Sequence, residues 1–318
     1  MQAYLEQLHF ILDNGIVRGD RTGVGTISVF GLTARYNMAD GFPAMTTKKL
    51  AWKVMSSELL WFISGSTNIN DLKEIYQHNK IWDANYDDYV KRLGMETSTG
   101  DMGRVYGSQW RKWQTVDGRE VDQLSDAVDL IKNNPNSRRI IVNAWNPGEA
   151  SPDQVALPPC HTFFQFYVAD GKLSLHMYQR SADMFLGVPF NIASYSLLLH
   201  MMAKITGLTA HEFVHTIGDA HIYLNAVEQA KEQITRSPLP RPSLKIVDRG
   251  QKTLDEFAMT DFSLSNYQSH APIKARMDVQ GNVSSYLSMA RIRKPWLRTI
   301  AVIPVSHTHR TLPTIYPS

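Results

Sequence analysis

The sequence contains a single cysteine, Cys160, within the stretch "ALPPCH". A lone Cys cannot form an internal disulfide, so its thiol is either an inert buried group or a nucleophile. A nucleophilic thiol needs positive charge or hydrogen-bond donors close to the sulfur. The two prolines before Cys160 restrict the backbone and would hold the thiol in one place.

The best charged partner for this thiol is Arg180. Residues 161–180 alternate as two strands joined through 169–171, and a hairpin brings its two ends together. His161 is a poorer partner for Cys160, because adjacent strand residues point to opposite faces. We therefore expect His161 on the other face of the strand, with a supporting role at most.

Four arginines, Arg21, Arg138, Arg139 and Arg180, lie where predicted strands or helices begin and end. The guanidinium fork matches two phosphate oxygens at once. Each arginine alone could equally be a surface salt-bridge residue. Together with a reactive Cys, they indicate an anionic and phosphorylated substrate.

Further polar residues could bind or react with such a substrate. Glu58 lies in an apolar helix, either at its exposed edge or partly buried with the raised pKa that acid–base catalysis requires. Asn191 follows a Pro near a helix start and is either an N-cap or an amide that reads a base edge. His221 and Tyr223 share one face if extended, so they could hold a sugar hydroxyl or merely satisfy a loop.

Helices and strands must position these side chains. Along the chain, the predicted helices and strands alternate without a regular βαβ pattern. This order predicts an α+β fold with a mixed sheet. The expected helices cover residues 1–15, 46–65, 123–135, 191–207 and 222–242. The expected strands cover 138–145 and both arms of 161–180, with a strand, bend and strand over 26–37.

The composition is that of a soluble globular protein, with 43% hydrophobic and 20% charged residues in 318. No Cys/His cluster has structural zinc spacing, and no uncharged apolar run reaches a membrane span, so we expect no metal and a cytoplasmic location. The net charge is +3, but residues 280–318 alone carry +5. The remaining residues carry a net −2, so the main body is not a basic surface of the kind that binds nucleic acid.

Taken together and in order, many motifs resemble those of the thymidylate synthase family, folate-dependent enzymes that methylate deoxyuridine monophosphate (dUMP). They include "DRTGVGT", "GFPAMTTKK", "ELLWFISGSTNIN", "IWDAN", "VYGSQWR", "NSRRIIVNAWNP", "ALPPCH", "YQRSADMFLGVPFNIASY", "GDAHIY" and "SHAPIKARMDV". The resemblance covers residues 1–279 as a catalytic domain and leaves 280–318 as a basic extension. It implies a large mixed sheet flanked by helices, and a homodimer in which two sheets stack back to back.

The resemblance also implies a mechanism with 5,10-methylenetetrahydrofolate as co-substrate. Cys160 would add to C6 of the uracil ring, which makes C5 a nucleophile towards the one-carbon unit. Glu58 would handle protons at O4, and Tyr106 would support removal of the C5 proton. Trp82 would shield the methylene intermediate before hydride transfer yields thymidylate (dTMP) and dihydrofolate. Arg180 and Asn191 complete the implied catalytic set.

The implied binding residues form two groups. Arg21, Arg180 and Ser181 would hold the phosphate, while Arg138 and Arg139 would reach the neighbouring subunit's phosphate site. The remaining residues implied for substrate binding are Gln179, Asp183, Asn191, His221 and Tyr223. The residues implied for folate binding are Lys48, Ile81, Trp82, Asp183, Leu186, Gly187, Phe190 and Tyr223.

Alternatives remain open from the sequence. The family normally ends at the position of Val279, where a free carboxylate helps to close the site, and 39 residues follow here. A looser site would admit water and make the chain a dUMP hydroxymethylase. A non-catalytic homologue that binds nucleic acid through its basic tail is a third reading. A cysteine hydrolase is disfavoured, because its usual signatures are missing and the arginines would have no role.

Overall fold

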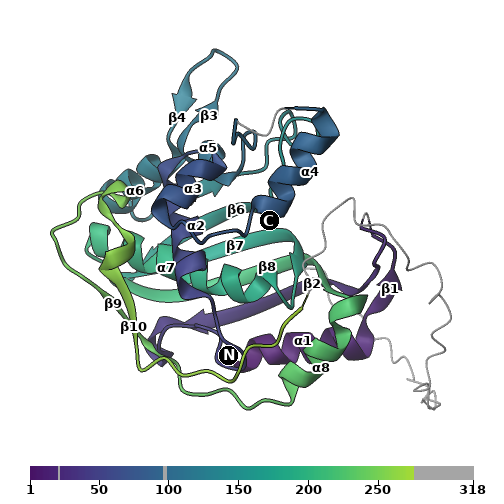
Figure 1. The fold of residues 1–318 in the computed structure, drawn as a ribbon. Helices are drawn as coiled ribbons and strands as arrows, with labels where there is room; N and C mark the ends of the chain where they lie inside the picture. The colour runs from purple at the N-terminus through teal and green to yellow at the C-terminus, as the bar shows by residue number, and fades with distance from the viewer. Residues whose placement is uncertain (21, 96–98, 276–318) are drawn as a thin grey trace, which may run out of the picture. The chain divides into compact units, whose positions relative to one another are not determined.

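A mixed six-stranded sheet organises the described part of the protein. The computed structural model describes residues 1–20, 22–95 and 99–275 (Figure 1). The strand order is β1-β2-β8-β7-β6-β5, in which β7 and β8 are parallel and the other neighbours antiparallel. These strands are β1 (Ile16–Arg18), β2 (Thr26–Asn37), β5 (Ile141–Asn143), β6 (His161–Ala169), β7 (Lys172–Asp183) and β8 (Thr209–Tyr223). The predicted α+β fold with a mixed sheet is confirmed.

Helices pack on this sheet, and most residues of α7 (Gly187–Thr206) are buried. It contacts β7, β8 and α2. Because it is enclosed on several sides, its own side chains are apolar on nearly every face. It ends at Gly207, as predicted. The other described α-helices are α1 (Gln2–Asn14), α2 (Trp52–Ser64), α3 (Ile69–Ile75), α4 (Asp83–Leu93), α5 (Tyr106–Arg111), α6 (Gln123–Asn133) and α8 (Val227–Ile234).

The hairpin of β6 and β7 forms where the sequence predicts it. Asp170 and Gly171 connect the strands with φ values of 49° and 69°. Positive φ at both central positions is what a tight type I′ turn requires. Two further described ribbons lie outside the large sheet: β3 (Trp113–Gln114) pairs with β4 (Glu120–Val121), and β9 (Ser243–Ile246) pairs with β10 (Phe262–Ser265).

Two helices are shorter than predicted because tertiary contacts compete for their ends. The helix expected at 46–65 begins only at Trp52. The Thr46 hydroxyl instead accepts a hydrogen bond from Leu239 N, and the Thr47 hydroxyl accepts one from Gln233 Nε2. The helix expected from residue 222 begins at Val227. Its predicted first residues instead complete β8, where Tyr223 is paired with Thr26 of β2.

The strands at 138–145 and 26–37 also differ from expectation. The first covers only Ile141–Asn143, and the second is one strand that continues through Gly31. No helix among the described residues is long and apolar enough to cross a membrane. The predicted extension at 280–318 lies outside the described residues, so the division after residue 279 stays a prediction.

Candidate active site

Cys160 lies one residue before β6 and directly beside Arg180 on β7. The Arg180 amide donates to the Cys160 carbonyl at 2.9 Å, and Arg180 Nη2 lies 3.7 Å from Cys160 Sγ. The same guanidinium donates to the carbonyls of Pro159 and Pro158 at 2.8 and 2.9 Å. The hairpin therefore brings Cys160 and Arg180 together as predicted. The two prolines have a second role besides restricting the backbone, because they bind Arg180. Their carbonyls fix the cation beside the thiol.

A glycine on the neighbouring strand allows this packing. A Cβ at Gly218 would lie 2.8 Å from both the Arg180 carbonyl oxygen and the Tyr178 hydroxyl. Because the Arg180 carbonyl belongs to the backbone and cannot rotate away, a side chain at Gly218 would displace β7 at Arg180. The absence of a side chain on β8 is therefore part of what positions Arg180.

Tyr106, the first residue of α5, contacts the backbone of the candidate nucleophile. Its hydroxyl accepts a 2.8 Å hydrogen bond from the Cys160 amide, and its ring lies 4.8 Å from that of His161. The side chain is buried, and burial followed by the nearby Cys160 charge raises the pKa of Tyr106 well above its ordinary value of 10. The phenol therefore keeps its proton at neutral pH.

Glu58 of α2 and Trp82 form a hydrogen-bonded pair near the Tyr106 ring. Trp82 Nε1 donates to Glu58 Oε1 at 2.7 Å, and the Trp82 ring lies 6.2 Å from Tyr106. Protein atoms surround the carboxyl group although the residue keeps some exposure. Burial raises the pKa of Glu58 from 4.5 to about 7, and the Trp82 hydrogen bond partly opposes this. Glu58 can thus exist in both protonation states near neutral pH.

His161 corrects the sequence-based expectation of a side chain on the opposite face. Its Nε2 lies 2.9 Å from Asn191 Nδ2, and its ring is tilted by 39° against that of Tyr106, so it faces α7 and the candidate site. The alternation rule fails because the β6 register shifts between His161 and Phe163. Burial, followed by the charge of Arg180, lowers the pKa of His161 to about 3. Its ring is therefore neutral.

Asn191 lies inside the first turns of α7, so it is not the helix N-cap. Its Oδ1 accepts from Gln179 Nε2 at 3.2 Å. Gln179 in turn contacts His215 at 2.9 Å. Sequence analysis did not single out His215. The available signal was its inward position in an alternating apolar strand, between Phe213 and Ile217, both fully buried.

The residues expected near folate meet at the start of α7. Asp183 accepts from the amides of Phe185 and Leu186 at 2.9 and 3.1 Å, which fixes the turn from β7 into the helix. Lys48 is buried, donates to the Phe185 carbonyl and lies 3.5 Å over that ring. Burial lowers the pKa of Lys48 to about 8 and raises that of Asp183. Lys48 thus points into the protein beneath this turn.

His221 and Tyr223 lie together at the end of β8, with their rings 5.2 Å apart. His221 Nδ1 lies 3.3 Å from Asp219 Oδ1, and this contact is the main cause of the lowered pKa of Asp219. Asp183 is paired with His221 across β7 and β8. The predicted sugar-binding pair is therefore adjacent to the turn that begins α7.

Other predicted residues separate into three groups. Arg138 and Arg139 are exposed between α6 and β5, and the described contacts do not connect them with Cys160. Arg21 lies outside the described residues. The rest lie on segments that border the cluster: Ser181 on β7, Ile81 before Trp82, and Leu186, Gly187 and Phe190 at the start of α7.

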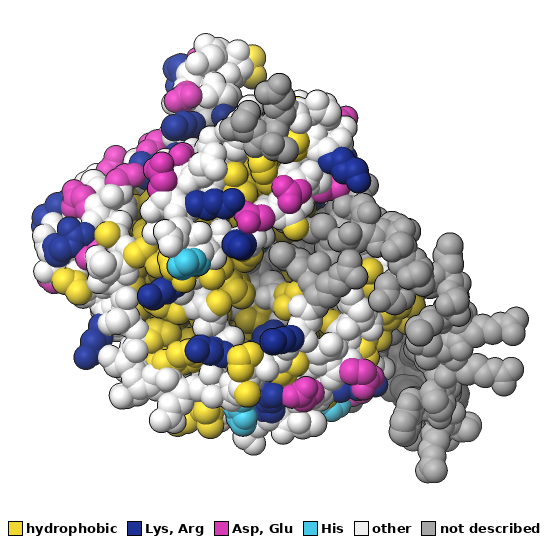
Figure 2. Space-filling view, viewed as in Figure 1, with side chains coloured by type: hydrophobic (Ala, Val, Ile, Leu, Met, Phe, Trp, Pro, Cys, Tyr) yellow, Lys and Arg dark blue, Asp and Glu magenta, His cyan; other side chains and the backbone are white. Residues whose placement is uncertain are grey.

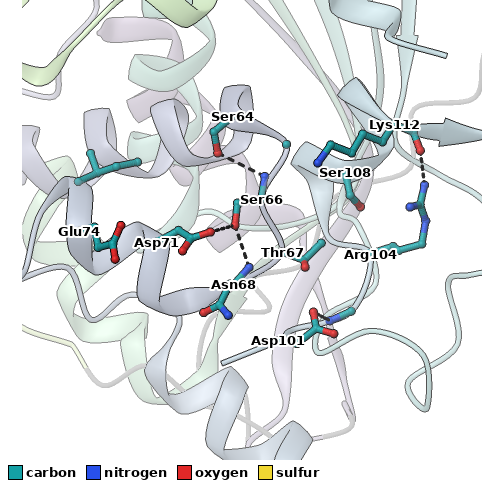
Figure 3. Close-up of a pocket in the computed structure, with 13 residues that line it drawn as sticks. Ser64, Ser66, Thr67, Asn68, Asp71, Glu74, Asp101, Arg104, Ser108 and Lys112 are labelled. Atoms are coloured by element: carbon teal, nitrogen blue, oxygen red, sulfur yellow. Dashed lines mark hydrogen bonds between the residues drawn. The ribbon is translucent and has the colours of Figure 1, made fainter. Parts of the chain in front are cut away.

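A separate polar cleft of about 910 Å³ lies beside the α2–α3 connection, α3 and α5 (Figure 3). Asp71, Asp101, Arg104 and Lys112 are among its lining residues. It borders the elements that carry Glu58 and Tyr106, but its lining contains none of the predicted catalytic or binding residues. We therefore place the candidate active site at the Cys160 cluster.

The face of the molecule shown in Figure 2 exposes hydrophobic side chains near its middle, with several Lys and Arg side chains around them. Among the described residues, no cluster of three or more His, Cys, Asp or Glu side chains could hold a metal ion. The groups described around Cys160 include its thiol, the Arg180 guanidinium, the Tyr106 phenol, the His161 imidazole, the Asn191 amide and the Glu58 carboxyl.

Comparison with known protein families agrees with the resemblance in the motifs. A family model described as "Thymidylate synthase" matches residues 2–279. Cys160, Arg180, Glu58 and Asn191 lie within this range. The chain belongs to the thymidylate synthase family.

Proposed function

We propose that this protein converts dUMP to dTMP, with 5,10-methylenetetrahydrofolate as donor of both the one-carbon unit and the hydride. Dihydrofolate is the second product. Family membership supports a methyltransferase of this kind. The observation that carries the proposal is the position of Arg180 Nη2, 3.7 Å from Cys160 Sγ, in a cluster with Tyr106 and Asn191.

The first step is covalent. The Cys160 thiolate forms a bond to C6 of the pyrimidine, and the electron pair of the C5–C6 double bond moves towards O4. Arg180 stabilises the thiolate, because its guanidinium is held at the sulfur by the carbonyls of Pro158 and Pro159. Glu58, with a pKa of about 7, can supply a proton near O4 or return one.

The second part transfers the carbon. C5 attacks the methylene group of the folate, loses its proton with assistance from Tyr106, and expels tetrahydrofolate to leave an exocyclic methylene. Hydride from tetrahydrofolate reduces this methylene to methyl, and Cys160 leaves C6. Trp82, held by its bond to Glu58, would shield the intermediate from water.

The binding roles are those that the family resemblance implies for each side chain. Asn191 would bond N3–H and O4 of uracil, and Gln179 lies behind it. Arg21, Arg180 and Ser181 would hold the phosphate. His221 and Tyr223 would hold the sugar hydroxyl. The folate would contact the start of α7 and its neighbours, namely Lys48, Ile81, Trp82, Asp183, Leu186, Gly187 and Phe190.

We also propose a homodimer that works in the cytoplasm, where both substrates are soluble metabolites. The sheet face opposite α7 exposes Ile141, Phe163 and Tyr167 by 42, 39 and 68%. A second copy of the same face would cover these apolar side chains. Arg138 and Arg139, exposed beside this face, would then reach the phosphate site of the neighbouring subunit.

The alternative reaction, hydroxymethylation of dUMP, uses the same Cys160 adduct and the same methylene intermediate. It differs in the last step, where water adds in place of hydride. The 39 residues after Val279 are the sequence feature that favours it. Product identity separates the two reactions.

A substrate analogue tests the covalent mechanism. In 5-fluoro-dUMP, fluorine replaces the C5 hydrogen that must leave as a proton, so reaction should stop after carbon transfer. We expect mass spectrometry to find Cys160 bonded to both nucleotide and folate when 5,10-methylenetetrahydrofolate is present. Failure to form any adduct at Cys160, in protein that binds dUMP, would reject this mechanism.

A further inference from the structure

Arg104 lies just before α5 and connects the two ends of that short helix. Its Nη2 donates to the carbonyl of Lys112, which directly follows the helix, at 2.7 Å (Figure 3). Its Nε donates to Glu149 Oε2 at 2.6 Å. Because Tyr106 is the first residue of α5, the Arg104 side chain fixes the segment that carries the phenol.

Glu149 accepts a second hydrogen bond from the same helix. Gln109 Nε2 donates to Glu149 Oε2 at 2.7 Å, and Gln109 is 1% exposed. The side chains of Arg104 and Glu149 are 28 and 25% exposed, so water competes only partly for these bonds. One carboxylate oxygen is thus shared by two donors from the α5 region. We call Arg104, Gln109 and Glu149 the α5 clamp.

The α5 clamp joins this helix to the loop that leads to Cys160. Glu149 belongs to the loop between β5 and β6, and Cys160 is the last residue of that loop. The backbones of the two segments also meet, because the Ala156 amide donates to the Met102 carbonyl at 2.8 Å. The final contact is the 2.8 Å hydrogen bond from the Cys160 amide to the Tyr106 hydroxyl. The position of this hydroxyl therefore depends on how firmly the two segments are joined.

We propose that Arg104 and Glu149 are positioning residues that hold the Tyr106 hydroxyl at the Cys160 backbone and so set the rate of C5 proton removal. This inference rests on the proposed function. In that step the C5–H bond breaks, its electron pair moves into the ring towards O4, and the proton passes to solvent water beside the hydroxyl. A displacement of about 1 Å can slow such a step about 100-fold. A partly exposed ion pair contributes little to stability, so its loss should move α5 without unfolding the protein.

Two rates, measured on the full-length protein, test this role. The first is the release of tritium from C5-tritiated dUMP in a single turnover with excess 5,10-methylenetetrahydrofolate. The second is the formation of the covalent complex with 5-fluoro-dUMP, which requires carbon transfer but no loss of a C5 proton. Arg104→Met should slow the first rate about tenfold or more and the second by no more than about threefold. A merely structural role would slow both rates by the same factor.

Variants of the partner residue make the test independent of Arg104. Glu149→Leu removes the shared acceptor and should reproduce the effect of Arg104→Met. Glu149→Gln keeps an oxygen that can accept from both donors, so both rates should stay within about threefold of wild type. The double variant Arg104→Met with Glu149→Leu should be no more than about threefold slower than either single variant, because the two residues act through one contact.

Arg119→Met is the matched control. Arg119 Nε donates to Asp117 Oδ2 at 2.7 Å, in the turn between β3 and β4 and outside the α5 clamp. Its replacement removes an arginine–carboxylate pair of the same kind, and both rates should remain those of the wild type. Scanning calorimetry of each variant confirms that the protein compared is folded.

The outcomes separate this inference from the proposed function. If the wild type neither releases tritium from C5 nor forms the complex with 5-fluoro-dUMP, the proposed function is wrong and this inference is wrong with it. If the wild type does both, but Arg104→Met and Glu149→Leu slow the two rates equally or not at all, the α5 clamp does not position Tyr106 and the proposed function stands.

Discussion

Arg180 Nη2 lies 3.7 Å from Cys160 Sγ, and the same guanidinium is bonded to the carbonyls of Pro158 and Pro159. The cation is thus fixed by the backbone that carries the thiol. Thiol and guanidinium form one unit, in which a change at either residue should alter the reactivity of the sulfur.

Replacing the Cys160 thiol should abolish turnover but preserve the binding of dUMP. Cys160→Ser should reduce kcat by at least about 10⁴-fold, because a hydroxyl is a far weaker nucleophile than a thiolate. The dissociation constant of dUMP should change by no more than about threefold, since the other contacts remain. Dihydrofolate absorbance and calorimetry measure the two quantities. Normal turnover in the variant would refute the nucleophile assignment.

Replacing the cation should slow alkylation of the thiol. Cys160 is the only cysteine, so incorporation of iodoacetamide reports on it alone. Arg180→Met should slow the reaction about tenfold or more, and Arg180→Lys should slow it less, because charge is kept while the two-pronged contact is lost. Equal rates in all three proteins would mean that Arg180 does not activate the sulfur.

The raised pKa of Glu58 predicts the direction in which the stability of the protein changes with pH. Burial raises its pKa from 4.5 to about 7, so between these values the folded protein keeps a proton that the unfolded chain has released. The stability contributed by Glu58 therefore falls as the pH rises from 4.5 to about 7. Glu58→Gln, always neutral, should raise the Tm relative to wild type at about pH 8, with a smaller difference at about pH 5.

Scanning calorimetry at both pH values measures this difference. Glu228→Gln, at a carboxylate that is 81% exposed, is the matched control and should show no such change with pH. A Glu58→Gln effect of equal size at both pH values would contradict the buried, proton-holding carboxyl.

The Glu58→Gln variant should also lower kcat about 100-fold or more, as expected for loss of an acid–base group.

Base preference should respond directly to Asn191. Asn191→Asp replaces the amide by a carboxyl, which when protonated donates through its O–H to N3 of cytosine while its other oxygen accepts from the amino group. We expect kcat/KM to shift towards dCMP, with a change in the dCMP-to-dUMP ratio of about 100-fold. An unchanged preference for dUMP would show that Asn191 does not read the base.

Mixed dimers test the proposed sharing of arginines. One protein carries Cys160→Ala and the other carries Arg138→Ala with Arg139→Ala. If these arginines serve the neighbouring site, a mixed dimer has one intact site, and random exchange should restore about one quarter of wild-type activity. The parents assayed separately provide the baseline. No gain on mixing would place both arginines outside the partner's site.

Local signals predict much of this fold. Asp170 and Gly171 between alternating strands predict the β6–β7 hairpin, and a segment before Gly207 that is apolar nearly all round predicts buried α7. The hairpin then gives the proximity of Cys160 and Arg180. These features depend on neighbours in sequence, which is why they can be read there.

Features set by distant contacts could not be read in the same way. The start of α2 is displaced because Thr46 and Thr47 bond to residues more than 180 positions away. His161 faces the site because a register shift at the start of β6 breaks the alternation. The contacts of Gln179 with His215 and Asn191 depend on how β7, β8 and α7 pack. Strand alternation marks His215 only as a polar side chain turned inward.

The identity of the nucleotide product tests the central proposal most directly. The full-length protein is incubated with dUMP and 5,10-methylenetetrahydrofolate, the nucleotide is identified by mass spectrometry, and dihydrofolate is followed by absorbance. The proposal predicts dTMP and dihydrofolate in equal amounts, with neither formed by Cys160→Ser. Formation of 5-hydroxymethyl-dUMP without dihydrofolate would contradict it.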